Sequence, residues 1–173
     1  MFYNGWKCGH YISNLFLFAP NGKICACYFN APGTVHDSTM ANRSGIYDSI
    51  DEIYVRTGGR VVVDSAFGKQ NRNSLIKSYA NNIDQQGRAQ QRTSVNRDAT
   101  SVRQLLEWGM RGLQGSFPRL RERILWEERG ERKLLLQLAI YLYNYRAEMV
   151  GFNQIATVYK QALELDANKL GSE

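Results

Sequence analysis

Residues 60–67 read Arg-Val-Val-Val-Asp-Ser-Ala-Phe, and glycines at positions 58, 59 and 68 bound this run. Three consecutive valines in a short bounded run predict a β-strand that is buried on both faces, as in the middle of a mixed sheet. The strand ends on Asp64, where a carboxylate is costly unless a metal ion or a basic partner compensates it. Two interpretations follow: Asp64 caps the next turn through its side chain, or it is a metal ligand at the carboxyl end of a central strand.

Two further strands are predicted upstream. Residues 10–19 are rich in Ile, Leu and Phe, and residues 23–30 carry apolar positions at period two. Pro20-Asn21-Gly22 between them is a turn signal, because Asn-Gly tolerates the positive φ values of a tight hairpin. Ala31-Pro32-Gly33 then stops the second strand, since proline cannot donate to the ladder.

Helices are predicted on both sides of the valine run. In chain order they are one through Met40 and Ala41, one at 45–53, one at about 100–112 and one at 132–149. Thr34 or Asp37 is the expected N-cap of the first, and Gly151 ends the last. Strands and helices in this order predict a mixed α/β layered domain.

The charge of the chain is unevenly spread. The 173 residues, the size of one domain, include 22 Lys and Arg against 16 Asp and Glu, a net charge of +6. Residues 69–103 hold seven basic residues and two acidic ones, and we expect mainly loop or short helix there. Such a run is either a solvated face or a surface that contacts nucleic-acid phosphates.

Several classes of protein and of site are disfavoured. No stretch reaches the roughly 18 apolar residues of a membrane span, and the amino terminus lacks a signal-peptide pattern. Cys8, Cys25 and Cys27 are too few for a disulfide framework, so we expect a soluble intracellular protein. With His10 these thiols could form a zinc site, but buried free cysteines are the favoured interpretation.

Two more carboxylates are candidate ligands. Glu107 is either a solvated helix residue paired with Arg103 or Arg111, or a metal ligand. Asp37 is either a helix N-cap or a further ligand. Hard oxygen ligands of this kind suit Mg²⁺ or Mn²⁺, and a pair of such ions can stabilise both oxygens in phosphodiester cleavage.

Four segments share an order that is typical of one family. They are Tyr-Asn-Gly-Trp-Lys at 3–7, Ala-Pro-Gly-Thr-Val-His-Asp-Ser at 31–38, Val-Val-Val-Asp-Ser-Ala-Phe at 61–67 and Arg-Gln-Leu-Leu-Glu-Trp-Gly at 103–109. Together they resemble the DDE superfamily endonuclease domain of PIF/Harbinger-type transposases. The resemblance covers about residues 1–160, including Gly-Phe-Asn-Gln-Ile at 151–155.

The resemblance implies an α/β RNase H-like fold, in which helices flank a mixed sheet. It also implies an enzyme that cleaves and joins DNA with Mg²⁺ or Mn²⁺. Asp64 matches the family's second acidic residue and Glu107 its third, which makes both implied catalytic and metal-binding residues. Asp37 matches a recurrent motif aspartate that need not bind metal. The expected nucleic-acid contacts are Lys69, Arg72, Lys77, Arg88, Arg92, Arg97 and Arg103. The expected partners are DNA, a separate Myb-like DNA-binding protein and a second copy of the chain, and the expected location is the nucleus.

The sequence also departs from the family pattern. The family's first catalytic aspartate lies on the central strand, upstream of the segment at 3–7, so we expect that residue and strand to be missing and cleavage to be impaired. The expected partial domain covers 1–165, with strands and first helices at 1–68, a basic insertion at 69–99, a helical part carrying the Glu at 100–165 and a polar tail at 166–173. The alternative function is a non-catalytic, domesticated module that binds DNA or protein.

Overall fold

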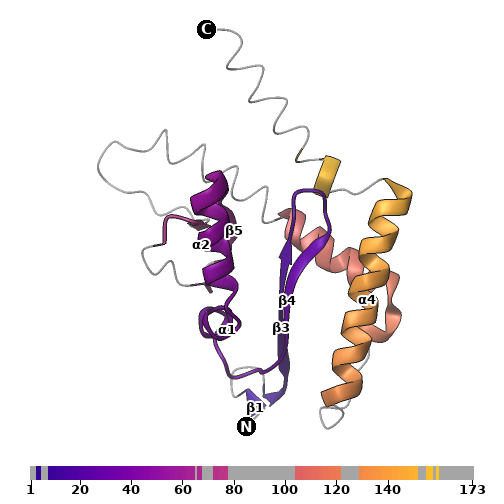
Figure 1. Cartoon of the computed structure of the whole chain (residues 1–173). Helices are drawn as coiled ribbons and strands as arrows, with labels where there is room; N and C mark the ends of the chain where they lie inside the picture. The colour runs from indigo at the N-terminus through magenta and orange to yellow at the C-terminus, as the bar shows by residue number, and fades with distance from the viewer. Residues whose placement is uncertain are drawn as a thin grey trace, which may run out of the picture. The chain divides into compact units, whose positions relative to one another are not determined.

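The computed structural model describes residues 3–4, 8–64, 66–67, 72–77, 104–121, 129–151, 155–157 and 159. The chain divides into two compact units: unit 1 is Met1–Leu15 with Ala31–Gln104, and unit 2 is Phe16–Asn30 with Leu105–Glu173. Small sheets and helices alternate along the chain (Figure 1), which agrees with the predicted α/β class.

The predicted hairpin is confirmed and contributes residues to both units. Strand β3 (Ile12–Phe18) pairs with β4 (Ile24–Pro32). In the turn the Gly22 N–H donates to the Ala19 carbonyl at 2.8 Å, and Gly22 has a φ of 78°. Glycine reaches such a φ without a steric penalty, which is why the turn forms at this position.

Two small sheets lie among the described residues of unit 1. Strands β1 (Tyr3–Asn4) and β2 (Gly9–His10) are antiparallel. Strands β5 (Val61–Val63) and β6 (Leu75–Lys77) are parallel, and the register pairs Val63 with Lys77.

One expectation about this region was wrong. The valine strand is not buried on both faces: Val63 is buried, but Val61 and Val62 are only half-buried. Among the described strands β6 is its partner, and a two-stranded sheet leaves part of each face open to water. The basic stretch contains this strand β6, which we had not predicted, because Leu75 and Ile76 alone make too short an apolar run.

Helices α1 (Asp37–Arg43) and α2 (Ile46–Thr57) follow the hairpin. The N-cap of α1 is His36, which makes no side-chain capping bond, so neither Thr34 nor Asp37 is the cap. Asp37 instead lies in the first turn, where its negative charge interacts favourably with the helix dipole.

Helix α2 was predicted at 45–53 and extends further, to Thr57. It begins after Gly45 and ends at Gly58, and these two glycines have φ values of 71° and 70°. The left-handed backbone at each end terminates the helix. Its buried side chains are Ile46, Tyr47 and Ile50.

Gly33, in the Ala-Pro-Gly segment, has a steric reason to be glycine. Its N–H donates to the Tyr11 carbonyl at 2.8 Å. A Cβ at this position would lie 2.6 Å from that same carbonyl oxygen. A backbone atom cannot move aside as a flexible side chain can, so no larger residue fits here.

Unit 2 packs helices against the hairpin. They are a helix at 104–116, the 3-10 helix η1 (Pro118–Arg121) and α4 (Arg129–Val150). The core comprises Ile24, Leu113, Ala139, Ile140 and Tyr143, with Phe16, Phe18, Phe29, Phe117 and Leu120 packed around it. Both predicted long helices are confirmed over the described residues: the first covers 104–116, with its predicted start at 100–103 outside the described residues, and Gly151 with a φ of 64° follows the second.

A side-chain clamp fixes β4 to α4. The Ile24 N–H donates to Asn144 Oδ1 at 2.8 Å, and Asn144 Nδ2 donates to the Ile24 carbonyl at 2.9 Å. The amide thus satisfies both backbone groups of one strand residue. Within the described residues, no helix combines the length and the apolar character needed to cross a membrane.

Candidate metal and nucleic-acid site

Asp64 lies directly after β5, and it is exposed. The turn that follows is closed by its backbone carbonyl, which accepts a hydrogen bond from the Phe67 N–H at 3.0 Å. Because β5 and β6 are parallel and Val63 is paired with Lys77, the carboxyl ends of both strands meet at one edge. Ligands of open α/β sheets commonly bind at such an edge, so Asp64 has a suitable position for a ligand.

Glu107 belongs to unit 2, on the helix at 104–116. Leu105 and Leu113 are 2% and 1% exposed, which defines the buried face of this helix, whereas Glu107 and Arg111 are exposed. Arg103, the other expected ion-pair partner, lies outside the described residues. Glu107 and Asp64 occupy different units, so their joint role as metal ligands stays a prediction.

Asp37 is half-buried at the start of α1 in unit 1. Its charge acts on Tyr47, a buried residue of α2. Burial is the main cause that raises the pKa of the Tyr47 phenol, Arg72 opposes the rise and Asp37 adds to it. Asp37 therefore contributes to the electrostatics of α2, and its role as a further metal ligand remains untested.

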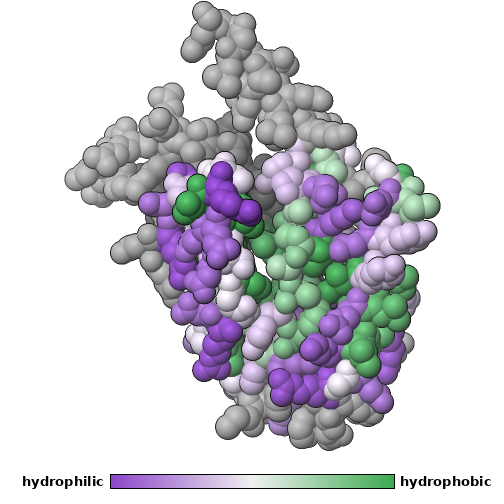
Figure 2. Space-filling model, viewed as in Figure 1, coloured by the Kyte–Doolittle hydropathy of each residue, from purple (hydrophilic) through white to green (hydrophobic). Residues whose placement is uncertain are grey.

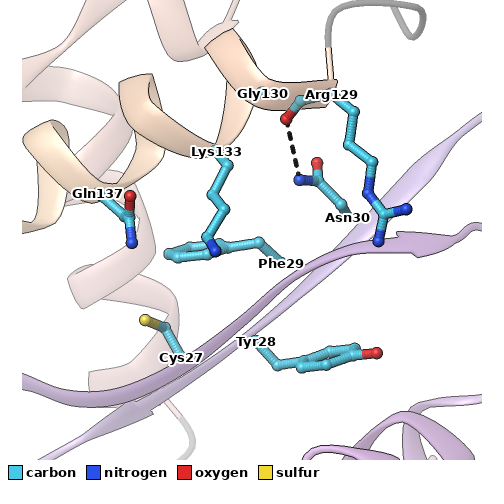
Figure 3. A pocket seen from close by; sticks show the side chains of 8 residues that line it. All are labelled: Cys27, Tyr28, Phe29, Asn30, Arg129, Gly130, Lys133 and Gln137. Atoms are coloured by element: carbon cyan, nitrogen blue, oxygen red, sulfur yellow. Dashed lines mark hydrogen bonds between the residues drawn. The ribbon is translucent and has the colours of Figure 1, made fainter.

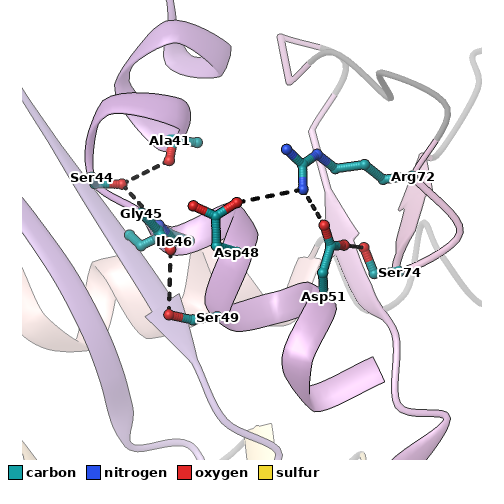
Figure 4. A network of polar contacts seen from close by, with 9 residues as sticks. All are labelled: Ala41, Ser44, Gly45, Ile46, Asp48, Ser49, Asp51, Arg72 and Ser74. Atoms are coloured by element: carbon teal, nitrogen blue, oxygen red, sulfur yellow. Dashed lines mark hydrogen bonds and ion pairs between the residues drawn. The ribbon is translucent and has the colours of Figure 1, made fainter. Parts of the chain in front are cut away.

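Arg72 is held by carboxylates of α2 (Figure 4). Its guanidinium donates to Asp51 and lies 3.9 Å from Asp48 Oδ1. Its Cζ lies 4.9 Å from the centroid of the Tyr47 ring, within cation–π range. The hydroxyl of Ser74, which is 1% exposed, donates to the other oxygen of Asp51. This network connects the approach to β6 with α2, and no local pattern in the sequence marks Asp51.

The remaining predicted phosphate contacts have no described side chains. Lys77 is the last residue of β6, and only its backbone is described. The others, which lie outside the described residues, are Lys69, Arg88, Arg92, Arg97 and Arg103. These contacts stay predictions.

The cysteines correct one expectation. None of Cys8, Cys25 and Cys27 is in a disulfide bond, and all three residues are exposed and not buried as expected. Partial shielding of the thiols from water still raises the pKa of Cys25 and of Cys27. Across the part of the chain that the structure describes, no cluster of three or more His, Cys, Asp or Glu side chains could hold a metal ion.

Unit 2 also contains an open groove between β4 and the first turns of α4, with a volume of about 710 Å³. Figure 3 shows Lys133 and Gln137 of α4 pointing toward the strand and the Cys27 thiol pointing toward the helix. At one end Asn30 Nδ2 donates to the Arg129 carbonyl at 3.3 Å. The Asn30 amide oxygen accepts a hydrogen bond of 2.6 Å from Arg132 Nε.

A comparison with protein families identifies the chain. Residues 1–144 match the model described as DDE superfamily endonuclease. No curated protein and no solved structure gives a significant match. The family match supports a nuclease ancestry of the transposase type, for which DNA is the implied substrate and divalent metals are the general cofactors. Because the match covers most of the chain, this protein belongs to the DDE superfamily endonucleases.

Proposed function

We propose that this chain is the endonuclease domain of a PIF/Harbinger-type transposase, which cleaves and joins DNA phosphodiester bonds with Mg²⁺ or Mn²⁺. Asp64 and Glu107 are its proposed metal-binding carboxylates, and Asp37 is a further candidate. The observation that carries the proposal is the family match over residues 1–144, which includes all three positions.

The chemistry of the donor residues suits a hard divalent cation. Asp64 and Glu107 are exposed, so their carboxylate oxygens are accessible to an ion without opening the core. When bound, divalent ions stabilise the attacking and the leaving oxygen of the phosphodiester. The carboxylates alone would repel a phosphate, and this repulsion makes their proposed role dependent on a cation.

The basic stretch is the proposed path of the DNA backbone. Six of its residues remain candidates for phosphate contact, namely Lys69, Lys77, Arg88, Arg92, Arg97 and Arg103. Arg72 differs, because its guanidinium already binds Asp51 and its side chain is only 22% exposed. We propose that sequence-specific recognition belongs to a separate Myb-like protein and that the pair acts in the nucleus.

Metal binding by the full chain tests the proposal without depending on catalysis. Mn²⁺ titrations are followed by electron paramagnetic resonance. The dissociation constant for Mn²⁺ should rise at least about tenfold in Asp64→Asn and in Glu107→Gln, because each variant loses one anionic ligand. Glu52→Gln is the matched control, since Glu52 is an exposed carboxylate of α2. Nicking of a supercoiled plasmid is the second readout. Variants that bind Mn²⁺ and nick DNA as the wild type does would contradict the proposed ligands.

The second candidate function is a non-catalytic binding module, and the excess of basic residues at 69–103 favours it. It predicts DNA binding that weakens steeply with salt and survives the Asp64→Asn and Glu107→Gln substitutions. It also predicts no nicking by the wild-type chain. The plasmid assay therefore separates the two functions.

A further inference from the structure

The open groove of unit 2, between β4 and the first turns of α4, carries positive charge. Its volume is about 710 Å³, and Arg129 and Lys133 contribute two cations to its lining. Asn30 and Gln137 contribute amides, and no carboxylate is among the lining residues that the structure describes. Figure 2 shows hydrophilic side chains over the lower part of α4, the end at which the helix begins. The groove therefore suits an anionic ligand.

The two cations are not neutralised by the acidic residue between them. Glu131 is two residues from both Arg129 and Lys133, so its side chain leaves α4 on the opposite side of the helix. Neither cation takes part in the salt bridges of the described residues. Helix α4 also has a second, exposed apolar face, outside the groove lining, which carries Leu134, Leu138 and Tyr141.

Buried hydrogen bonds hold the end of the groove in place. Asn30 donates to the Arg129 carbonyl and accepts from Arg132, and Asn30 and Arg132 are 8% and 4% exposed. Burial is the main cause that lowers the pKa of Arg132, and the charge of Arg129 adds to it. An anion bound beside Arg129 would reduce this repulsion between the two arginines. Because the groove is already formed, a ligand does not bear the cost of ordering it.

The spacing of the two cations matches that of side chains on an extended peptide. Arg129 and Lys133 are four residues apart on one face of α4, a rise of about 6 Å along the axis. In an extended chain, the side chains at positions i and i+2 point to one face and lie about 6.6 Å apart. We propose that the groove binds an extended acidic segment of a partner protein, with carboxylates at alternate positions on Arg129 and Lys133. Gln137, one turn further along, supplies a donor and an acceptor for the peptide backbone.

Fluorescence anisotropy of the full chain tests the proposal, which does not depend on nuclease activity. The probe is fluorescein-Thr-Glu-Thr-Glu-Thr-amide, measured with EDTA so that metal binding does not contribute. It should bind with a dissociation constant below about 1 mM, and Lys133→Glu should raise that constant at least about tenfold. Arg111→Glu is the matched control, since Arg111 is an exposed cation of the same unit outside the groove lining. Absence of binding, or an equal effect of both variants, would overturn the proposal.

A second peptide of the same composition tests the spacing. Fluorescein-Thr-Thr-Glu-Glu-Thr-amide has the same net charge, but its carboxylates occupy adjacent positions, which point to opposite sides of an extended chain. It should therefore bind several-fold more weakly than the alternating peptide. Circular dichroism checks that the Lys133 and Arg111 variants keep the fold. Equal affinity for the two peptides would show that the groove recognises net charge alone, and it would overturn the extended-peptide assignment.

Alkylation of Cys27 locates the bound peptide. Cys27 lines the groove, with its thiol pointing toward α4 (Figure 3), whereas Cys8 is an exposed thiol of unit 1. Saturating peptide should slow the modification of Cys27 by iodoacetamide several-fold and leave that of Cys8 unchanged, as measured by mass spectrometry. Equal rates with and without peptide would overturn the location. A DNA duplex that protects Cys27 and displaces the peptide would assign the groove to nucleic acid and overturn the proposal as well.

Discussion

Arg72 in unit 1 and Arg132 in unit 2 are both held by side chains from distant parts of the sequence, but in different ways. Arg72 binds the carboxylate of Asp51, and 22% of the Arg72 side chain and 39% of the Asp51 side chain are exposed. Arg132 is 4% exposed and donates to the neutral amide oxygen of Asn30. One arginine is thus paired with charge near water, and the other is buried against an amide.

The difference affects what each network contributes to stability. Water screens the partly exposed pair around Arg72, so that pair adds a modest amount. Burial is the main cause that lowers the pKa of Arg132, and the neighbouring charge of Arg129 adds to it. A buried donor that loses its acceptor keeps its full desolvation cost. We therefore expect the Arg132 network to be the more sensitive one.

Asn30→Gly should have the largest effect, a loss of about 3 kcal/mol in the free energy of unfolding, because the buried Arg132 Nε–H loses the acceptor at Asn30. Glycine is chosen because Asn30 has a φ of 64°, which glycine adopts without strain. Urea denaturation measures the change. Asn21→Gly, at an exposed turn position of the same hairpin, should cost about 1 kcal/mol or less. Equal costs for the two variants would remove the contrast between buried and exposed amides.

Asp51→Ala should have an intermediate effect, about 1–2 kcal/mol, because Arg72 and the buried Ser74 hydroxyl both lose this acceptor. High salt should reduce the difference between wild type and variant, since the ion pair is partly exposed. The neighbouring Glu52→Ala, at an exposed position, should change stability by less than about 0.5 kcal/mol. A cost as large as that of Asn30→Gly would show that exposure does not distinguish the networks.

Tyr47→Phe comes last, because its expected effect is on the pH dependence of stability in alkaline solution. Burial holds the pKa of Tyr47 above its ordinary value, so the folded state favours the protonated phenol. This contribution is complete below about pH 10 and is lost as the pH rises through the raised pKa. Urea denaturation from about pH 9 to about pH 11 should show a steeper loss of stability for the wild type than for the variant. Parallel profiles would contradict this assignment.

The hairpin, helix α2 and helix α4 could be predicted, because their signals lie in consecutive residues. Pro20-Asn21-Gly22 encodes its turn locally, and the apolar spacing of α4 needs no distant partner to be recognised. Strand β6 was missed because a three-residue parallel strand depends on pairing with β5, across an eleven-residue connection at 64–74. The half-buried state of Val61 and Val62 likewise depends on how many strands flank them.

The candidate site shows the same division. Asp64 was singled out because a carboxylate after a valine run is unusual in the sequence itself. Nothing local indicates that Arg72 pairs with Asp51, twenty-one residues earlier in the chain. Nor does the Cys25-x-Cys27 spacing show that both residues are exposed.

The sequence by itself determined the turn, the principal helices, the order of the four motifs and the membership of the DDE superfamily endonucleases that they predicted. Each of these depends on short-range patterns that a single stretch of chain carries. Only the tertiary structure decided that Asn30 accepts a hydrogen bond from a buried arginine 102 residues away, and that α4 has a second, exposed apolar face. Burial and pairing arise when segments that are distant in the sequence pack together. The contacts that a residue makes with those segments decide whether its side chain is buried in the structure or exposed and available for binding.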